Sequence, residues 1–153
     1  MSSVLAQQAE DDAENWVMAT VANPVTQQEQ CMLKSAVVTI SDGYDTTPVT
    51  LLINNDGLIV VTESIIDDSF KDLTLVVDEN EAIKTQRVVN EKIVVFEQNV
   101  EGIIEQFIKG YDATVYLRFW PTFPATQSFP AQFSLRGFTK AYENLADCSS
   151  PAQ

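Results

Sequence analysis

Two cysteines and a set of carboxylates are the side chains of this sequence that could do chemistry. There is no histidine among the 153 residues. This excludes Ser-His-Asp and Cys-His mechanisms in their usual forms, and it excludes His-ligated zinc, copper and non-haem iron sites. Two cysteines alone do not make a structural zinc site. We therefore expect no metal centre and no cofactor.

Cys31 and Cys148 lie far apart in the chain and have two interpretations. In an oxidising compartment they would form a disulfide, and closing so long a loop would stabilise the fold by up to roughly 5 kcal/mol on the chain-entropy model. In a cytosolic protein they would be two buried free thiols. The disulfide is the favoured prediction, because both cysteines lie near the edges of predicted elements.

Carboxylates can perform acid–base chemistry without histidine, as the paired carboxyl groups of glycosidases do. The densest groups are Asp67-Asp68 and residues 78–81. Each lies beside a predicted turn, where acidic residues are common, so solvated turns are the favoured interpretation. Residues 54–57 match part of an EF-hand loop, but the closing Glu and the flanking helices are absent. Neither pattern predicts an active site.

Aromatic side chains gather in the last third of the chain. Tyr116, Trp120, Phe123 and Phe129 are interleaved with three prolines. They could present an apolar loop to a partner protein or to a sugar. The alternative is that these rings cap one end of a hydrophobic core. Tyr116, Trp120 and Phe123 are the predicted contact residues, and the last two are expected to be the most exposed.

The net charge and the apolar content of the chain indicate which classes of partner are not expected. The net charge is −13, from 22 acidic and 9 basic residues. This argues against nucleic acid, because its binding depends on neutralising phosphates with Lys and Arg, and against an anionic membrane surface. No apolar run approaches the roughly 20 residues of a membrane-spanning helix, so we expect no membrane insertion. The length and the apolar content of 45% suit one domain with a single core.

The elements that must position these residues are mostly strands. Short apolar runs with period two, separated by turn residues every eight to twelve positions, are typical of a β-sandwich. The clearest hairpin joins residues 48–53 to 58–62, where Asp56-Gly57 is expected to supply a positive φ. A second hairpin is predicted around residues 78–81.

Two segments have the spacing of a helix instead. Residues 100–108 have apolar side chains at i, i+3, i+4, i+7 and i+8, with Asn99 as the predicted N-cap and Gly110 at the C-terminal end. Residues 128–135 alternate like a strand, and Phe138 then begins a short terminal helix. The predicted fold is mainly β, a β-sandwich or jelly-roll-like fold with one internal helix and one C-terminal helix.

The predicted domain organisation is simple. Residues 14–148 form a single β-sandwich domain, and residues 149–153 form a tail. Residues 1–13 are polar, acidic and without period, which predicts a disordered tail. This tail is interpreted either as the remnant of a signal peptide or as the frayed beginning of a cytosolic chain.

The end of the chain resembles a known family. Residues 133–141 read Phe-Ser-Leu-Arg-Gly-Phe-Thr-Lys-Ala, with Leu145 following. This is similar to the closing motif of the invasion-associated locus B family, close to Ser-Leu-x-Gly-Phe-Thr-x-Ala. Other features of the family occur here in the same order: an early Trp (Trp16), a Cys that opens a strand (Cys31) and a Lys-Gly before a strand (Lys109-Gly110). Residues 88–96, however, lack the two cysteines that members often carry. The family's disulfide set is therefore not carried over. The resemblance implies a secreted or periplasmic bacterial protein of all-β fold, associated in some members with host-cell invasion.

Three functions are weighed against one another. The first is a non-enzymatic envelope or secreted β-sandwich that acts through protein–protein contacts. The second is a carbohydrate or small-ligand binding module that uses the aromatic loop. A carboxylate hydrolase is the third.

Overall fold

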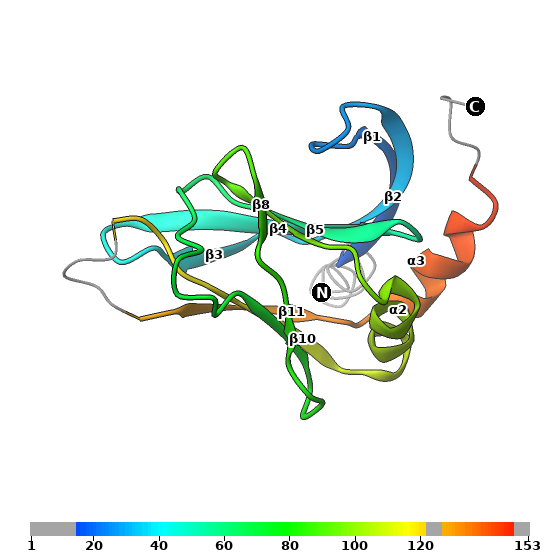
Figure 1. Cartoon of the computed structure of the whole chain (residues 1–153). Helices are drawn as coiled ribbons and strands as arrows, with labels where there is room; N and C mark the ends of the chain where they lie inside the picture. Colours follow the sequence, from blue (N-terminus) through cyan, green and yellow to red (C-terminus); the bar gives the residue numbers. More distant parts are fainter. Residues whose placement is uncertain (1–14, 122–126, 149–153) are drawn as a thin grey trace, which may run out of the picture.

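The protein is described by a computed structural model that covers residues 15–121 and 127–148. Its strands form two antiparallel sheets that face each other (Figure 1). The larger, seven-stranded sheet has the order β1-β2-β4-β5-β9-β8, with β3 paired to β4, and the four-stranded sheet has the order β11-β10-β6-β7. The prediction of a mainly β sandwich with two helices is therefore confirmed. The predicted tails at residues 1–13 and 149–153, and Phe123, lie outside the described residues.

The strands and helices have the following bounds: β1 Trp16–Ala22, β2 Glu29–Ser35, β3 Val38–Ser41, β4 Thr46–Asn54, β5 Gly57–Val61, β6 Thr74–Val77, β7 Ile83–Lys84, β8 Arg87–Val89, β9 Ile93–Phe96, α2 Val100–Lys109, β10 Asp112–Leu117, β11 Phe129–Ser134 and α3 Phe138–Leu145.

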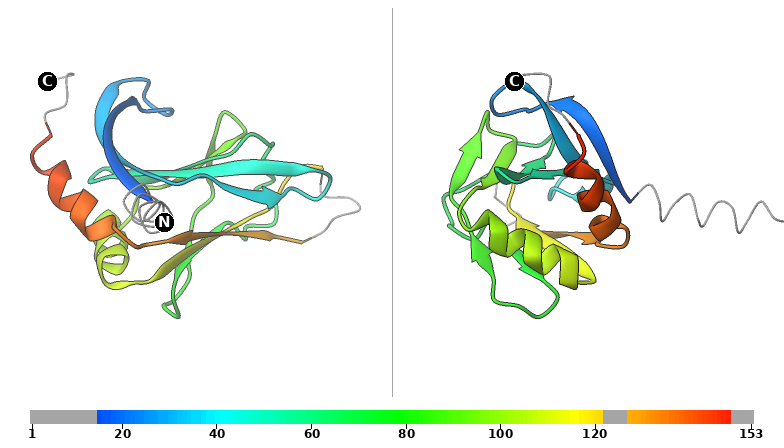
Figure 2. Two further views of the ribbon diagram at one scale, coloured as in Figure 1. Left: turned by 180° about the vertical axis from the view of Figure 1, so that it is seen from behind. Right: turned by 90° about the vertical axis from the view of Figure 1, so that its right-hand side faces the viewer.

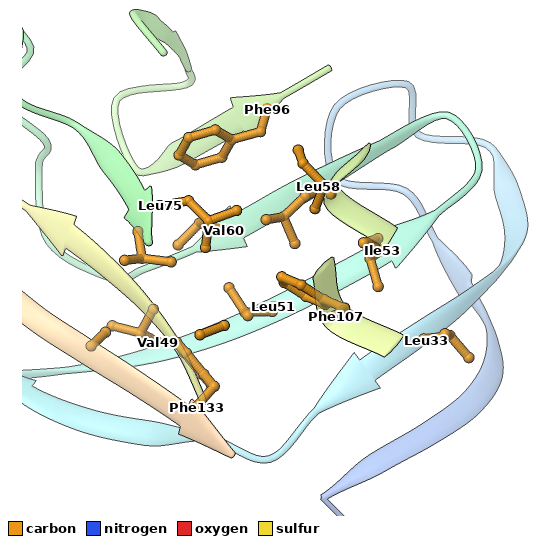
Figure 3. Close-up of a cluster of buried hydrophobic side chains, with 14 of the residues drawn as sticks. Leu33, Val49, Leu51, Ile53, Leu58, Val60, Leu75, Phe96, Phe107 and Phe133 are labelled. Atoms are coloured by element: carbon orange, nitrogen blue, oxygen red, sulfur yellow. The ribbon is translucent and has the colours of Figure 1, made fainter. Parts of the chain in front are cut away.

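The core lies between the two sheets. In β10, Ala113, Val115 and Leu117 point inward and are fully buried, while the residues between them are half-buried on the outer face. This is the period of two that a half-buried strand requires. Matching side chains enter from β4 and β5, and Phe107 of α2 lies among them (Figure 3).

A second apolar cluster lies on the outer face of the larger sheet. It consists of Met32, Leu52, Ile59, Ile93 and Val95. The β1–β2 hairpin bends toward this face (Figures 1 and 2), and side chains at its end pack on the cluster. Strands β4, β5 and β9 therefore have both faces buried, which explains why their sequences are continuous apolar runs instead of alternating ones.

The segment between residues 29 and 41 forms two strands, β2 and β3, with a break between them. β2 pairs with β4 through Leu33 opposite Ile53, whereas β3 pairs through Val38 opposite Val49, so the register slips by one residue. Ser35 fills the break, because its buried hydroxyl accepts a hydrogen bond from the Leu51 N–H at 2.9 Å. This is a β-bulge, in which a side chain replaces a lost partner of the ladder.

The hairpin at residues 54–57 forms where predicted, but for another reason. None of its residues has a positive φ, so the expected role of Asp56-Gly57 is wrong. Asn54 Oδ1 instead accepts the Asp56 N–H at 2.8 Å, which closes the turn through a side chain.

Both helices cover the same end of the sandwich and contact each other (Figure 2). Helix α2 begins at Asn99 as predicted, but the Asn99 side chain makes no capping hydrogen bond. The helix buries Ile103, Ile104 and Phe107. Ile108, which was placed on the same face, is 40% exposed.

Candidate functional site

The candidate site is the end of the sandwich opposite the helices, which we call the loop end (Figure 1). It comprises the turn at residues 42–45, the segment 62–72, the turn at 89–92 and the segment 118–121. Backbone hydrogen bonds tie these segments together: the Thr62 N–H donates to Lys92 O at 3.0 Å, and the Asp67 N–H donates to Arg118 O at 2.8 Å. The loop end is therefore built on paired backbone, although most of it lies outside the strands.

Exposed apolar side chains gather on this surface. Ile65, Phe70 and Trp120 are 39%, 50% and 58% exposed, and we call them the aromatic patch. The Trp120 N–H donates to Ile65 O at 2.8 Å, which places these two residues side by side. Tyr44 is also exposed, on the neighbouring turn. Exposed aromatic groups of this kind are typical of binding surfaces.

A partly buried ion pair packs against the Phe70 ring. The Arg118 side chain is only 10% exposed, and its Nε and Nη2 both donate to Asp72 Oδ2 at 2.9 and 2.7 Å. The guanidinium carbon lies 4.1 Å from the centre of the Phe70 ring, which is a cation–π contact. Arg118 Nη1 and Asp72 Oδ1 are buried without a hydrogen-bond partner in the described part of the chain. The pair thus orients the ring at the cost of two unsatisfied polar atoms.

Asp42 fastens the β3–β4 turn to this end. Its carboxylate accepts the Asp45 N–H at 2.7 Å and the Ser64 hydroxyl at 2.7 Å. The hydrogen bond from the Asp45 backbone is the main reason that the pKa of Asp42 lies below its ordinary value, and desolvation opposes this shift. The turn that presents Tyr44 is therefore held against the segment that presents Ile65.

The predicted contact residues lie in different surroundings. Trp120 is exposed as expected. Tyr116 is half-buried on the outer face of the smaller sheet, where it pairs with Pro130 and Thr74. Phe129, the other aromatic of this group, points toward the core, with its ring 6.4 Å from that of Phe119. The core-capping interpretation thus holds for Phe129.

Phe70 and Ile65 were missed from the sequence. Phe70 is a single aromatic between Ser69 and Lys71 in a polar stretch, and that isolation is the one signal that could have found it. The periodicity of apolar residues does not reveal Phe70, because it identifies only residues that recur on a buried face.

The two carboxylate groups are structural features of the fold. Asp67 was expected to be a solvated turn residue, but it is 5% exposed, and its Oδ1 accepts the N–H and the hydroxyl of Ser69. Asp78 accepts the N–H groups of Tyr111 and Asp112 at 3.0 Å each, which joins the β6–β7 turn to β10. Over residues 15–121 and 127–148, no group of three or more Cys, Asp or Glu side chains is placed to hold a metal ion.

The cysteines form the predicted disulfide. Cys31 in β2 is bonded to Cys148 just beyond α3, with 6.2 Å between the two Cα atoms. The bond spans 117 positions and fastens the end of the chain to the larger sheet. It is compatible with an oxidising compartment.

Comparison of the chain with protein-family models, with curated proteins and with solved structures finds no match in any of the three. The resemblance of residues 133–141 to the invasion-associated locus B family therefore stays a prediction. Within the described residues, no helix is both long and apolar enough to cross a bilayer.

Proposed function

We propose that this is a non-enzymatic protein of the periplasm or of the secreted fraction, and that it binds a partner protein through the aromatic patch. The observation that supports this most directly is the exposure of Trp120 at 58%, with its N–H bonded to the neighbouring Ile65 and with Phe70 exposed on the same end of the sandwich. Large aromatic side chains held in fixed orientations are the usual anchors of protein interfaces, because burying them on binding costs little conformational entropy.

Charge around the patch favours a basic partner. Among the described residues, the loop end has seven carboxylates and three cations. Leaving out the Arg118–Asp72 ion pair and the buried Asp67, five carboxylates and two cations remain. An acidic rim steers a positively charged surface toward the apolar centre and discriminates against acidic proteins. The expected partner surface therefore has apolar side chains surrounded by Lys and Arg.

The disulfide and the resemblance support the compartment. A role in contact with host cells is what the resemblance adds to the proposal. Fractionating cells that express the full-length gene tests the compartment, and recovery of the protein only in the cytosol would contradict it.

Site-specific photo-crosslinking tests the interface. A photoreactive amino acid at position 120 should trap a partner in the envelope or secreted fraction of the source cells. The matched control is position 111, because Tyr111 is 81% exposed but follows α2 at the other end of the sandwich. Equal crosslinking at both positions, or none at position 120, would contradict the proposal. Lys-to-Glu substitutions in the trapped partner should then weaken the complex.

A glycan is the second candidate, and the exposed Trp120 ring favours it, since aromatic faces stack on sugars. The two tryptophans allow a clean test, because Trp16 is buried at 3% exposure and Trp120 is not. A sugar that stacks on Trp120 should shift the tryptophan fluorescence of the wild type and leave that of Trp120→Phe unchanged. A panel of glycans that shifts neither protein would eliminate this candidate.

A further inference from the structure

Strand β1 forms one edge of the larger sheet in the described part of the chain. It is paired with β2 alone within the described residues. Its seven residues, Trp-Val-Met-Ala-Thr-Val-Ala, include no charge and no proline, and its register with β2 has no bulge. Exposed edge strands usually carry a charge, a proline or a bulge, because these prevent their free backbone groups from pairing with other strands.

Other edge strands of this protein carry a charge or a proline, or are very short. Strand β11 contains Pro130, β8 begins with Arg87, and β7 is only two residues long. The contrast indicates that β1 is kept open for pairing.

The hydrogen-bonding groups of β1 that face outward can be assigned. The Ala36 N–H donates to Asn15 O at 2.9 Å, and the Asn23 N–H donates to Gln28 O at 2.9 Å. Because hydrogen-bonded and non-hydrogen-bonded pairs alternate in an antiparallel ladder, the odd-numbered residues between these points bond to β2. The backbone groups of the even-numbered residues, including Met18 and Thr20, therefore point away from the sheet.

A groove of about 480 Å³ runs beside this edge. Trp16, Val17 and Met18 form one wall, and α3 with the turn that follows it forms the other. Helix α3 runs in the same direction as β1, because the Phe138 ring lies 5.1 Å from that of Trp16 and Cys148 Sγ lies 4.0 Å from Thr20 Oγ1.

The α3 wall has opposite charges at its two ends. Lys140 lies near its beginning and Asp147 near its end, with Ala141 and Asn144 between them. Both charged residues are exposed, and neither forms an ion pair with another described residue. Lys140 is in α3, whereas Asp147 lies two residues beyond its end, in the turn that follows.

We propose that a second copy of this chain occupies the groove, with β1 pairing antiparallel to β1 of the copy about a two-fold axis. Such an axis extends the sheet across the interface and sets the two α3 helices antiparallel on the same face. Lys140 then faces Asp147 of the other copy, and the reverse contact forms at the same time. The wall is thus complementary to itself, and the uncharged β1 brings no like charges together despite the net charge of −13.

Sedimentation velocity from micromolar to millimolar protein tests the interface. The wild type should form a dimer as concentration rises. Thr20→Pro removes one outward-facing N–H without disturbing the ladder with β2, so it should shift the protein to monomer. Thr20→Ala is the matched control, because it keeps that N–H, and it should dimerise like the wild type.

Charge reversal on α3 and the turn after it tests the same two-fold interface and leaves the sequence of β1 unchanged. Lys140→Glu and Asp147→Lys should each weaken dimerisation about tenfold, since the symmetry places each change in both contacts. The double variant Lys140→Glu/Asp147→Lys should restore wild-type affinity. A wild type that stays monomeric would overturn the proposal and leave the edge to a strand of another protein. A dimer that survives both Thr20→Pro and Lys140→Glu, or a double variant that fails to recover, would also overturn it.

Discussion

Replacing Phe107 with Ala should be among the most destabilising single changes in this protein. The Phe107 side chain is 1% exposed and lies in the centre of an aromatic cluster. Its ring centre is 6.0 Å from that of Trp16 and 5.2 Å from that of Phe138, with both pairs in edge-to-face orientations. The cluster joins β1, α2 and α3, so the cavity would open where three elements meet.

The magnitude follows from burial and ring contacts. A buried Phe→Ala change costs about 3–5 kcal/mol, and two lost edge-to-face contacts place this one at the upper end. Domains of this size have a free energy of unfolding of about 5–15 kcal/mol, so the variant should fold but be marginal. With a urea m-value of about 2 kcal/mol/M, the midpoint should fall by roughly 2 M.

Urea unfolding with the disulfide intact is the assay. Trp16 lies in the same cluster and should report the transition by fluorescence, and far-UV circular dichroism gives the second probe. Ile108→Ala is the matched control, because Ile108 is the next residue of α2 and is 40% exposed. It should cost less than about 1 kcal/mol. Equal losses in the two variants would refute the packing of α2 described above.

Three further predictions concern the covalent link, the pH dependence and the exposed ring. Thiol titration in denaturant without reductant should find no free thiol, and Cys31→Ala/Cys148→Ala should lose about 2–4 kcal/mol of stability in thermal or urea unfolding. Asp42→Asn should be less stable than the wild type at neutral pH, because the lowered pKa of Asp42 stabilises the folded state above the ordinary value of 3.8. That difference should shrink as pH falls below this value and through the folded-state pKa, and a gap that persists in acid would contradict the account. Acrylamide should quench the fluorescence of the native protein mainly through Trp120, so Trp120→Phe should leave a poorly quenched emission from Trp16.

Much of the fold follows from local patterns in the sequence. The spacing of Ile103, Ile104 and Phe107 predicts α2, because a helix with one apolar side must bury it. The alternation of apolar and polar residues in 128–135 predicts β11, because a strand with one apolar face must also bury it. The pairing of Cys31 with Cys148 was favoured because the chain has one pair of cysteines and both lie near the edges of predicted elements. In each case the information is contained within a few turns of chain or in the count of one residue type.

Local patterns do not determine what covers each face. The runs in β4, β5 and β9 predict strands, but burial of their outer faces depends on the β1–β2 hairpin bending over the sheet. Ile108 satisfies the helical period and is nevertheless 40% exposed, which the period alone does not predict. Asp67 and Asp68 are neighbours in a polar segment, yet Asp67 is buried, and its N–H donates to Arg118 O, which is far away in the sequence.

The sequence by itself determined the class of fold, the two helices, the disulfide and the exclusion of histidine chemistry. Tertiary structure alone placed Phe70 over Arg118, brought Ile65 beside Trp120, and set the edge of β1 next to α3. The physical reason is that periodicity fixes the direction of each side chain relative to its own element. Contacts between distant segments depend on the order of strands in the two sheets, which is selected by the packing energy of the whole domain.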